Sequence, residues 1–130
     1  MTIEFTVSTI IKVNPHHVYS AWMSSTGHTR MTGSPAVITD AIGTEFTAWD
    51  GYIRGRNLEL VEDRKIVQSW RSMEFSPDEE DSILEVTLEP VGENTRLTLH
   101  HYNLPPHGAQ YEKGWEESYF QPMKEYFEAP

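Results

Sequence analysis

The central part of the chain, residues 36–103, consists of short runs in which apolar and polar residues alternate, separated by turn sequences. Alternation with a period of two is typical of strands that bury one face. It predicts strands over residues 36–39, 44–49, 52–60, 64–71, 82–89 and 95–103. The turns between these runs, among them Asp50-Gly51 and Gly92-Glu93-Asn94, are too short to hold crossover helices. The pattern therefore predicts an antiparallel meander.

The segment before this meander predicts one further strand and a short helix. Residues 3–13 alternate and are rich in threonine, valine and isoleucine, which favours a strand. Asn14 followed by Pro15 combines a capping side chain with proline at the first helical position, and so predicts a helix over 16–23. Residues 24–34 give a weaker signal for a second short helix, because two glycines interrupt them.

The last segment predicts one long helix. Pro105 and Pro106 end the strands, and residues 109–128 then carry aromatic side chains at positions 111, 115, 119 and 126. This spacing places the rings on one face of a helix. Pro122 lies inside the helix and is expected to kink it, since proline has no amide donor.

Together these elements predict an α+β fold in a single domain, residues 1–130. A curved seven-stranded antiparallel sheet is expected to wrap around the long C-terminal helix, with one or two short helices after the first strand. The sheet must bury one face against the helix, and a twisted sheet of this size curls. We therefore expect an apolar space between the sheet and the helix. A chain of 130 residues is long enough to build such a core without disulfides or bound metal ions.

The charge of the chain limits its partners. Ten basic residues against twenty acidic ones give a net charge of −10, which argues against a nucleic-acid partner because phosphates are bound by lysine and arginine. No apolar stretch approaches the roughly 18 residues of a membrane span, so we expect no membrane insertion. The N-terminal residues lack the pattern of a secretory signal, and a cytoplasmic location is expected.

The acidic residues are concentrated between Arg71 and Arg96, where no basic residue occurs. The acidic residues of this stretch are Glu74, Asp78, Glu79, Glu80, Asp81, Glu85, Glu89 and Glu93. One interpretation is a solvated loop and strand face. The other is a docking patch for a basic partner surface, whose binding rate would fall steeply with salt.

Alternation also predicts which side chains face the space between sheet and helix. Within residues 52–60 we favour Ile53 as inward, because the opposite choice would bury Arg54 and Arg56 without partners. The same reasoning gives a set of cavity-lining candidates for a ligand site: Trp22, Phe46, Ile53, Gln68, Trp70, Val86, Leu99, His101, Trp115 and Tyr119.

Gln68 and His101 are the polar members of this otherwise apolar set. A few polar groups that converge in an apolar hollow are typical of a small-molecule site. The alternative is that each one is a core residue bonded to a neighbour or to water. The aromatic members of the set likewise have two interpretations: they form the wall of a pocket, or they are ordinary core residues.

The sequence offers little for catalysis or metal binding. It has no cysteine, and its two pairs of adjacent histidines, His16-His17 and His100-His101, lack the spacing of zinc ligands. No nucleophile elbow and no phosphate-binding glycine pattern occurs. We expect no metal, no cofactor and no catalytic residue. His101 is the best inward candidate for acid–base work, since an unperturbed histidine titrates near neutrality.

Several motifs along the chain resemble those of one known superfamily. They are Gly43-Thr44-Glu45-Phe46, Asp50-Gly51, Gly55, Leu60, Ile66-Val67-Gln68-Ser69-Trp70-Arg71, Gly92 to Leu99, Leu104-Pro105, Gly114-Trp115 and Tyr119-Phe120. In this order they resemble the helix-grip (START-like, SRPBCC) superfamily, in the branch related to the activator of the heat shock protein 90 ATPase. The resemblance covers nearly the whole chain, and its most specific parts are Trp70-Arg71 and Gly114-Trp115.

The resemblance implies the helix-grip fold with its cavity, and three possible functions. Related branches bind lipids, hormones or polyketide-like molecules, which favours binding of a small hydrophobic molecule. The second hypothesis is a chaperone-partner module, although the eukaryotic activators have a further N-terminal domain for which this chain has no room. The third is a cyclase-type enzyme that uses His101. The family supplies no invariant catalytic set, so no catalytic residue is carried over.

Overall fold

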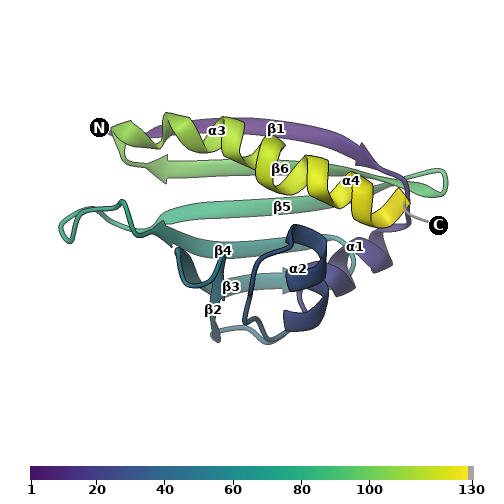
Figure 1. Cartoon of the computed structure of the whole chain (residues 1–130). Coiled ribbons are helices and arrows are strands. Elements are labelled where there is room, and N and C mark those ends of the chain that lie inside the picture. The colour runs from purple at the N-terminus through teal and green to yellow at the C-terminus, as the bar shows by residue number, and fades with distance from the viewer. Residues whose placement is uncertain (129–130) are drawn as a thin grey trace.

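The structure, a computed structural model, describes residues 1–128 and contains one antiparallel sheet of six strands (Figure 1). The strands are β1 (Ile3–Ile11), β2 (Glu45–Ala48), β3 (Ile53–Val61), β4 (Lys65–Ser72), β5 (Ser82–Val91) and β6 (Asn94–Leu104). Their order is β1-β6-β5-β4-β3-β2, so β2 to β6 form a meander and β1 pairs with the last strand. The antiparallel meander is confirmed. The expected count of seven strands is wrong.

The missing strand is the one expected over residues 36–39. Val37 forms an isolated bridge to Thr47, with amide-to-carbonyl hydrogen bonds of 3.0 and 2.9 Å, and no ladder extends from it. The chain leaves the sheet after this bridge because the Asn57 side chain holds the next loop. The Asn57 amide donates to the carbonyls of Thr39 and Ala41, at 2.8 and 3.0 Å.

Two short helices follow β1. Helix α1 (Pro15–Trp22) begins as expected, with the Asn14 side chain accepting a hydrogen bond from the amide of His17 at 3.1 Å. The weaker signal in residues 24–34 corresponds to a real helix, α2 (Ser25–Thr32). Ser24 caps its start, and Gly33 ends it in the left-handed conformation with φ of 85°.

The C-terminal helix is continuous in space but changes its winding three times. A 3-10 turn, η1 (Pro106–Ala109), leads into α3 (Gln110–Trp115), then a π-helical segment, η2 (Glu116–Phe120), and α4 (Gln121–Glu128). In the π segment the Gln121 amide bonds to the Glu116 carbonyl, five residues back. The wider turn comes directly before Pro122, which cannot donate a backbone hydrogen bond.

The π segment also changes which side chains face the sheet. Tyr111, Trp115 and Tyr119 are buried as expected. Tyr126 is 38 % exposed, so the prediction that it lies on the same face as these three is wrong. The extra residue in the π turn rotates the following helix by about one residue, roughly 100°. The buried positions at the end of the π turn and beyond it are Phe120 and Met123 instead.

The helix lies across the sheet, and α2 lies on the same side (Figure 1). The core between them contains the inward sets expected from strand alternation. Leu84, Val86 and Leu88 of β5 are buried, and so are Ile53 of β3 and Trp70 of β4. No helix within residues 1–128 is both long enough and apolar enough to cross a membrane.

Two glycines allow a stability test with a matched control. A Cβ atom built on Gly55 of β3 would lie 1.8 Å from the backbone oxygen of Ser69, whereas one built on Gly114 of α3 meets nothing within 4 Å. We expect Gly55→Ala to lower the unfolding free energy by about 3 kcal/mol, because backbone must move. Gly114→Ala should raise it by about 1 kcal/mol through helix propensity. Urea unfolding measures the unfolding free energy of both variants. Equal changes in the two would contradict the contrast between the crowded Gly55 and the open Gly114.

Candidate functional site

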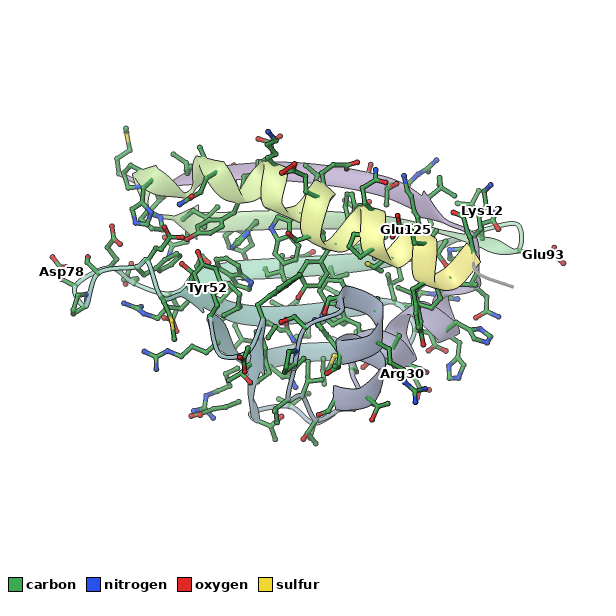
Figure 2. The ribbon with its side chains drawn as sticks, viewed as in Figure 1. Lys12, Arg30, Tyr52, Asp78, Glu93 and Glu125 are labelled. Atoms are coloured by element: carbon green, nitrogen blue, oxygen red, sulfur yellow. The ribbon has the colours of Figure 1, made fainter. Side chains whose placement is uncertain are left out.

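A pocket of about 300 Å³ opens between the first half of the C-terminal helix and the end of the sheet where β2 turns into β3. Its lining residues are Trp49, Tyr52, Ile53, Trp70, Tyr111, Gly114, Trp115, Ser118 and Tyr119. Six of these nine residues are aromatic. Tyr52, which directly precedes β3, is labelled in Figure 2. The hollow predicted between sheet and helix therefore exists, displaced toward one end of the sheet.

The helix side of the pocket is formed by one stripe of residues. Tyr111, Gly114, Trp115 and Ser118 are three or four positions apart, so they lie on the same face. Gly114 stands in the middle of this stripe, and a side chain built there would enter open space. The pocket owes part of its volume to the missing side chain at this position.

The sheet side includes a turn with unusual backbone conformations. Trp49, Asp50 and Gly51 all have positive φ, of 54, 56 and 89°. Such a conformation is unfavourable for a bulky residue like tryptophan, by about 1–3 kcal/mol. A hydrogen bond of 2.8 Å from the Asp50 amide to the Pro35 carbonyl holds the turn. The turn brings Trp49 and Tyr52 to the pocket, although neither lies on an inward strand position.

A second layer of aromatic residues supports the pocket wall. Trp22 of α1 stacks on Tyr119, with ring centres 5.1 Å apart and planes at 29°. Buried His28 of α2 accepts a hydrogen bond from the Tyr119 hydroxyl at 2.7 Å and donates one to the Trp22 carbonyl at 2.9 Å. Burial lowers the pKa of His28, which keeps its ring neutral. These contacts fix the orientation of the Tyr119 ring.

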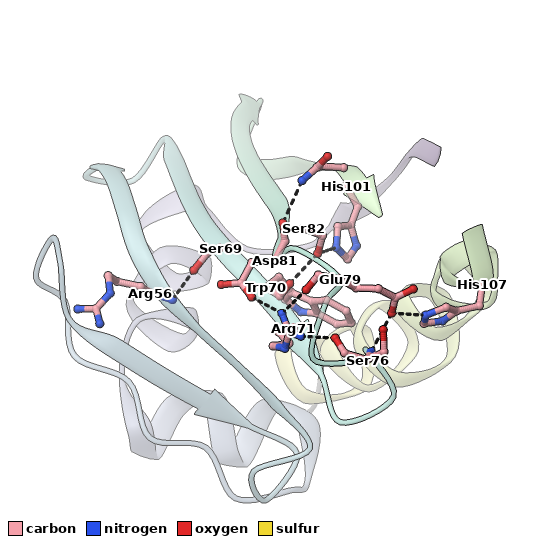
Figure 3. Close-up of polar contacts among 11 residues, drawn as sticks. Arg56, Ser69, Trp70, Arg71, Ser76, Glu79, Asp81, Ser82, His101 and His107 are labelled. Atoms are coloured by element: carbon pink, nitrogen blue, oxygen red, sulfur yellow. Dashed lines mark hydrogen bonds and ion pairs between the residues drawn. The ribbon is translucent and has the colours of Figure 1, made fainter. Parts of the chain in front are cut away.

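His101 joins the helix to three strands, and Figure 3 shows the part of this link that runs from His101 to Ser82 and Trp70. The Trp115 indole donates to His101 Nδ1 at 3.1 Å, so the ring proton is on Nε2, which donates to Ser82 Oγ at 2.9 Å. The Ser82 hydroxyl in turn donates to the Trp70 carbonyl at 2.7 Å. Burial lowers the pKa of His101 to about 3, with a smaller contribution from His100. Both ring nitrogens are engaged, and His101 does not line the pocket.

Gln68 is also engaged away from the pocket. Its side-chain amide donates to Asn57 Oδ1 at 2.9 Å, and Asn57 holds the loop that follows the Val37 bridge. Gln68 and His101 thus have the bonded arrangement of core residues, which was the alternative to ligand contact. No residue cluster suited to a metal ion occurs in the described part of the chain.

Of the ten lining candidates, the pocket brings together Ile53, Trp70, Trp115 and Tyr119. The other six are buried but do not line it: Trp22, Phe46, Gln68, Val86, Leu99 and His101. Five lining residues were missed: Trp49, Tyr52, Tyr111, Gly114 and Ser118. The spacing of aromatic residues in 109–128 could have predicted Tyr111 as a lining residue. No sequence pattern indicated the turn residues Trp49 and Tyr52.

The acidic stretch does not form one surface. Asp78 and Glu93 lie at opposite ends of the molecule (Figure 2). The whole length of β5 separates the loops that carry them. The loop that carries Asp78 is ordered by Arg71, which donates to the carbonyls of Ser76 and Glu79 and pairs with Asp81 at 2.8 Å (Figure 3).

A second anchor holds the same loop. His107 lies 2.9 Å from Glu79, and its hydrogen bond is the largest cause of the lowered pKa of that carboxyl. The loop therefore presents exposed Asp78 and Glu80 on a fixed backbone.

A curved antiparallel sheet that holds a C-terminal helix, with a pocket between them, defines the helix-grip class of START-like proteins. The chain matches the family described as "Activator of Hsp90 ATPase homolog 1-like protein" over residues 12–128. It belongs to this family.

Curated relatives are similar to the chain in sequence. The chain is 27% identical over 124 residues to "Activator of 90 kDa heat shock protein ATPase homolog 2" of Mus musculus, and 26% identical over 129 residues to homolog 1 of Homo sapiens. These matches cover 95% and 97% of this chain but 37% of each relative, so the chain spans little more than a third of their length.

Solved structures support the same fold. An HSP90 activator from Plasmodium falciparum, PFC0360w, matches with a TM-score of 0.86 at 23% identity, over 94% of both chains. CalU16 from Micromonospora echinospora matches with a TM-score of 0.81 at 19% identity, over 97% of this chain and 76% of that one.

The buried state of His101 predicts a pH dependence of stability. Its pKa is about 3 in the folded chain against 6.5 for the free group, so below pH 6.5 the unfolded chain binds a proton that the folded chain does not. As the pH is lowered below 6.5, this group should therefore decrease the unfolding free energy by up to about 1.4 kcal/mol for each pH unit.

The variant His101→Gln tests this by urea unfolding between pH 7.5 and 5. We expect it to be about 2 kcal/mol less stable at pH 7.5, because hydrogen bonds to buried groups are lost. Its stability should decline less steeply with acid than that of the original chain. If the unfolding free energies of the variant and the original chain fell equally with acid, the assignment of the pH dependence to His101 would be wrong.

Proposed function

We propose that this protein binds a small apolar molecule in the aromatic pocket. The observation that carries the proposal is the pocket itself, about 300 Å³ in volume with six aromatic residues among nine in its lining. This volume is at the lower end of ligand sites, which run from about 300 to 1,000 Å³. The occupant is therefore a compact molecule and not a long-chain lipid.

The walls of the pocket are organised before any ligand arrives. The Trp115 indole is held by the hydrogen-bond chain through His101 and Ser82, and the Tyr119 hydroxyl is held by His28. The Trp70 ring packs edge-on against the His101 ring, with ring centres 4.6 Å apart. Fixed walls lose little side-chain entropy on binding, which favours affinity. The same chain occupies both nitrogens of His101, so this proposal gives His101 a structural role and no acid–base work.

Position 114 gives a direct test of this proposal. Gly114→Leu places a side chain into the open space of the pocket without removing a ring, and Gly114→Ala is the matched control. The neutral fluorescent probe N-phenyl-1-naphthylamine should bind the original chain saturably with one site. Gly114→Leu should weaken binding at least tenfold, because the leucine fills the site, while Gly114→Ala should change it far less.

Circular dichroism melting confirms that both variants are folded. The absence of saturable binding to the original chain would overturn the proposal. Equal binding by the folded Gly114→Leu variant would overturn it as well.

A second candidate function is a chaperone partner. It is favoured by the relatives described as activators of the 90 kDa heat shock protein ATPase, and by the structural match to an HSP90 activator over 94% of both chains. In this proposal the ordered loop with Asp78 and Glu80 is the contact surface, since fixed exposed charges can steer a basic partner.

Charge reversal at the two ends of the molecule tests this candidate. The ATPase rate of heat shock protein 90 from the same organism should rise on addition of the chain. The double change Asp78→Lys and Glu80→Lys should reduce that rise several-fold, and more so at low salt, because it reverses the steering charge. Glu93→Lys, at the opposite end, is the control and should leave the rise unchanged. An ATPase rate that never responds to the chain would refute the candidate.

A further inference from the structure

The polar groups around the aromatic pocket limit the chemistry of its ligand. Among the described residues that line it, none carries a positive charge, so nothing there pairs with a carboxylate or phosphate. Three tyrosine hydroxyls are already engaged: Tyr52 with Glu74, Tyr111 with Ser72, and Tyr119 with His28. Ser118 supplies the remaining hydroxyl of the lining, so a ligand with many hydrogen-bonding groups would leave most of them unpaired on binding.

The arrangement of the rings favours a rounded ligand over a flat one. A flat aromatic ligand is best held between parallel walls. Trp70 and Trp115 meet at 47°, and Trp115 and Tyr119 at 49°. Tyr111 is turned 73° from Trp70, and Trp49 is turned 68° from Tyr119. These walls therefore form a cage instead of a slot.

The electrostatic surroundings of the cage are negative. Aromatic faces carry negative quadrupole charge and attract cations, most strongly in tryptophan. The Glu74 carboxylate sits behind the Tyr52 hydroxyl. Burial raises the pKa of Tyr111, and the negative charges of Glu74 and Glu79 raise it further. The chain as a whole carries a net charge of −10.

Among the described residues that line the cage there is no arginine. Arg54 and Arg71 line a separate hollow on the other side of Tyr52. Arg71 is already paired with Asp81 at 2.8 Å. A positive ligand in the cage is therefore attracted by the faces of the rings, and the Glu74 carboxylate behind Tyr52 adds to this attraction.

We propose that the ligand of the aromatic pocket is a compact organic cation whose positive group has no N–H, such as a quaternary ammonium. This inference rests on the proposed binding function: the methyl groups of such a cation are the apolar surface that contacts the pocket, and the charge that they surround specifies the ligand class. A primary ammonium would bring three donors into a pocket whose tyrosine hydroxyls are engaged, whereas a quaternary nitrogen brings none. Six aromatic residues supply the attraction that replaces its hydration.

A pair of probes that differ only in charge tests the proposal. Phenyltrimethylammonium and tert-butylbenzene have the same shape, with a charged nitrogen replaced by a neutral carbon. Each is used to displace N-phenyl-1-naphthylamine from the original chain, with Gly114→Leu as the filled-pocket control. We expect the cation to bind at least tenfold more tightly than its neutral isostere, and only when the pocket is open.

Fluorinated tryptophan tests the physical cause. Replacing all four tryptophans by 5-fluorotryptophan weakens the negative face of each ring and changes its shape little. The affinity for phenyltrimethylammonium should fall several-fold, and that for tert-butylbenzene should stay the same. Melting temperature confirms that the fluorinated chain is folded.

The outcomes separate this inference from the proposed function. If tert-butylbenzene binds as tightly as the cation or more tightly, the inference is overturned and the apolar pocket stands. If fluorination weakens both probes equally, the cation preference does not come from the rings, and the inference is overturned too. If neither probe nor N-phenyl-1-naphthylamine binds, both proposals fail.

Discussion

The hydrogen bond from the Trp115 indole to His101 is the contact on which the rest of the arrangement depends. It joins the C-terminal helix to β6, and the chain continues through Ser82 of β5 to the carbonyl of Trp70 in β4. A helix held only by apolar packing could slide along the sheet, because the hydrophobic effect has no direction. A buried donor with one available acceptor fixes the helix at one position, since moving it would leave both groups unsatisfied.

The fixed position of Trp115 explains why the helix contains a π turn. From Tyr111 to Tyr119 the helix presents one aromatic face to the pocket, and beyond it the core is completed by Phe120 and Met123. A regular helix could not turn both sets inward, because Tyr119 and Phe120 are neighbours about 100° apart. The extra residue of η2 rotates the second half, and Pro122 tolerates the change because it needs no backbone acceptor.

Strand alternation was sufficient to predict the meander and the buried faces of β2, β4, β5 and β6. Trp70 followed from it directly, since burial is decided by the side on which a residue lies. For Ile53 a second argument was needed, the cost of burying the neighbouring arginines. It could not predict where the core would be incompletely filled. That depends on the missing side chain of Gly114, and on a turn in which Trp49 has a conformation that local preference disfavours. Gln68 and His101 show the same limit, since only the fold reveals that their bonds are directed to core partners.

The pocket and the acidic loop are physically connected, so their two proposed functions are not independent. Phe75, at the start of that loop, packs against Trp70 at 6.0 Å and against Tyr111 at 6.3 Å, both of which line the pocket. Its other neighbour is His107, which holds Glu79. A partner that shifts the loop must move Phe75, and with it the pocket wall. By thermodynamic linkage, a ligand in the pocket would then change partner affinity by the same factor as the partner changes ligand affinity.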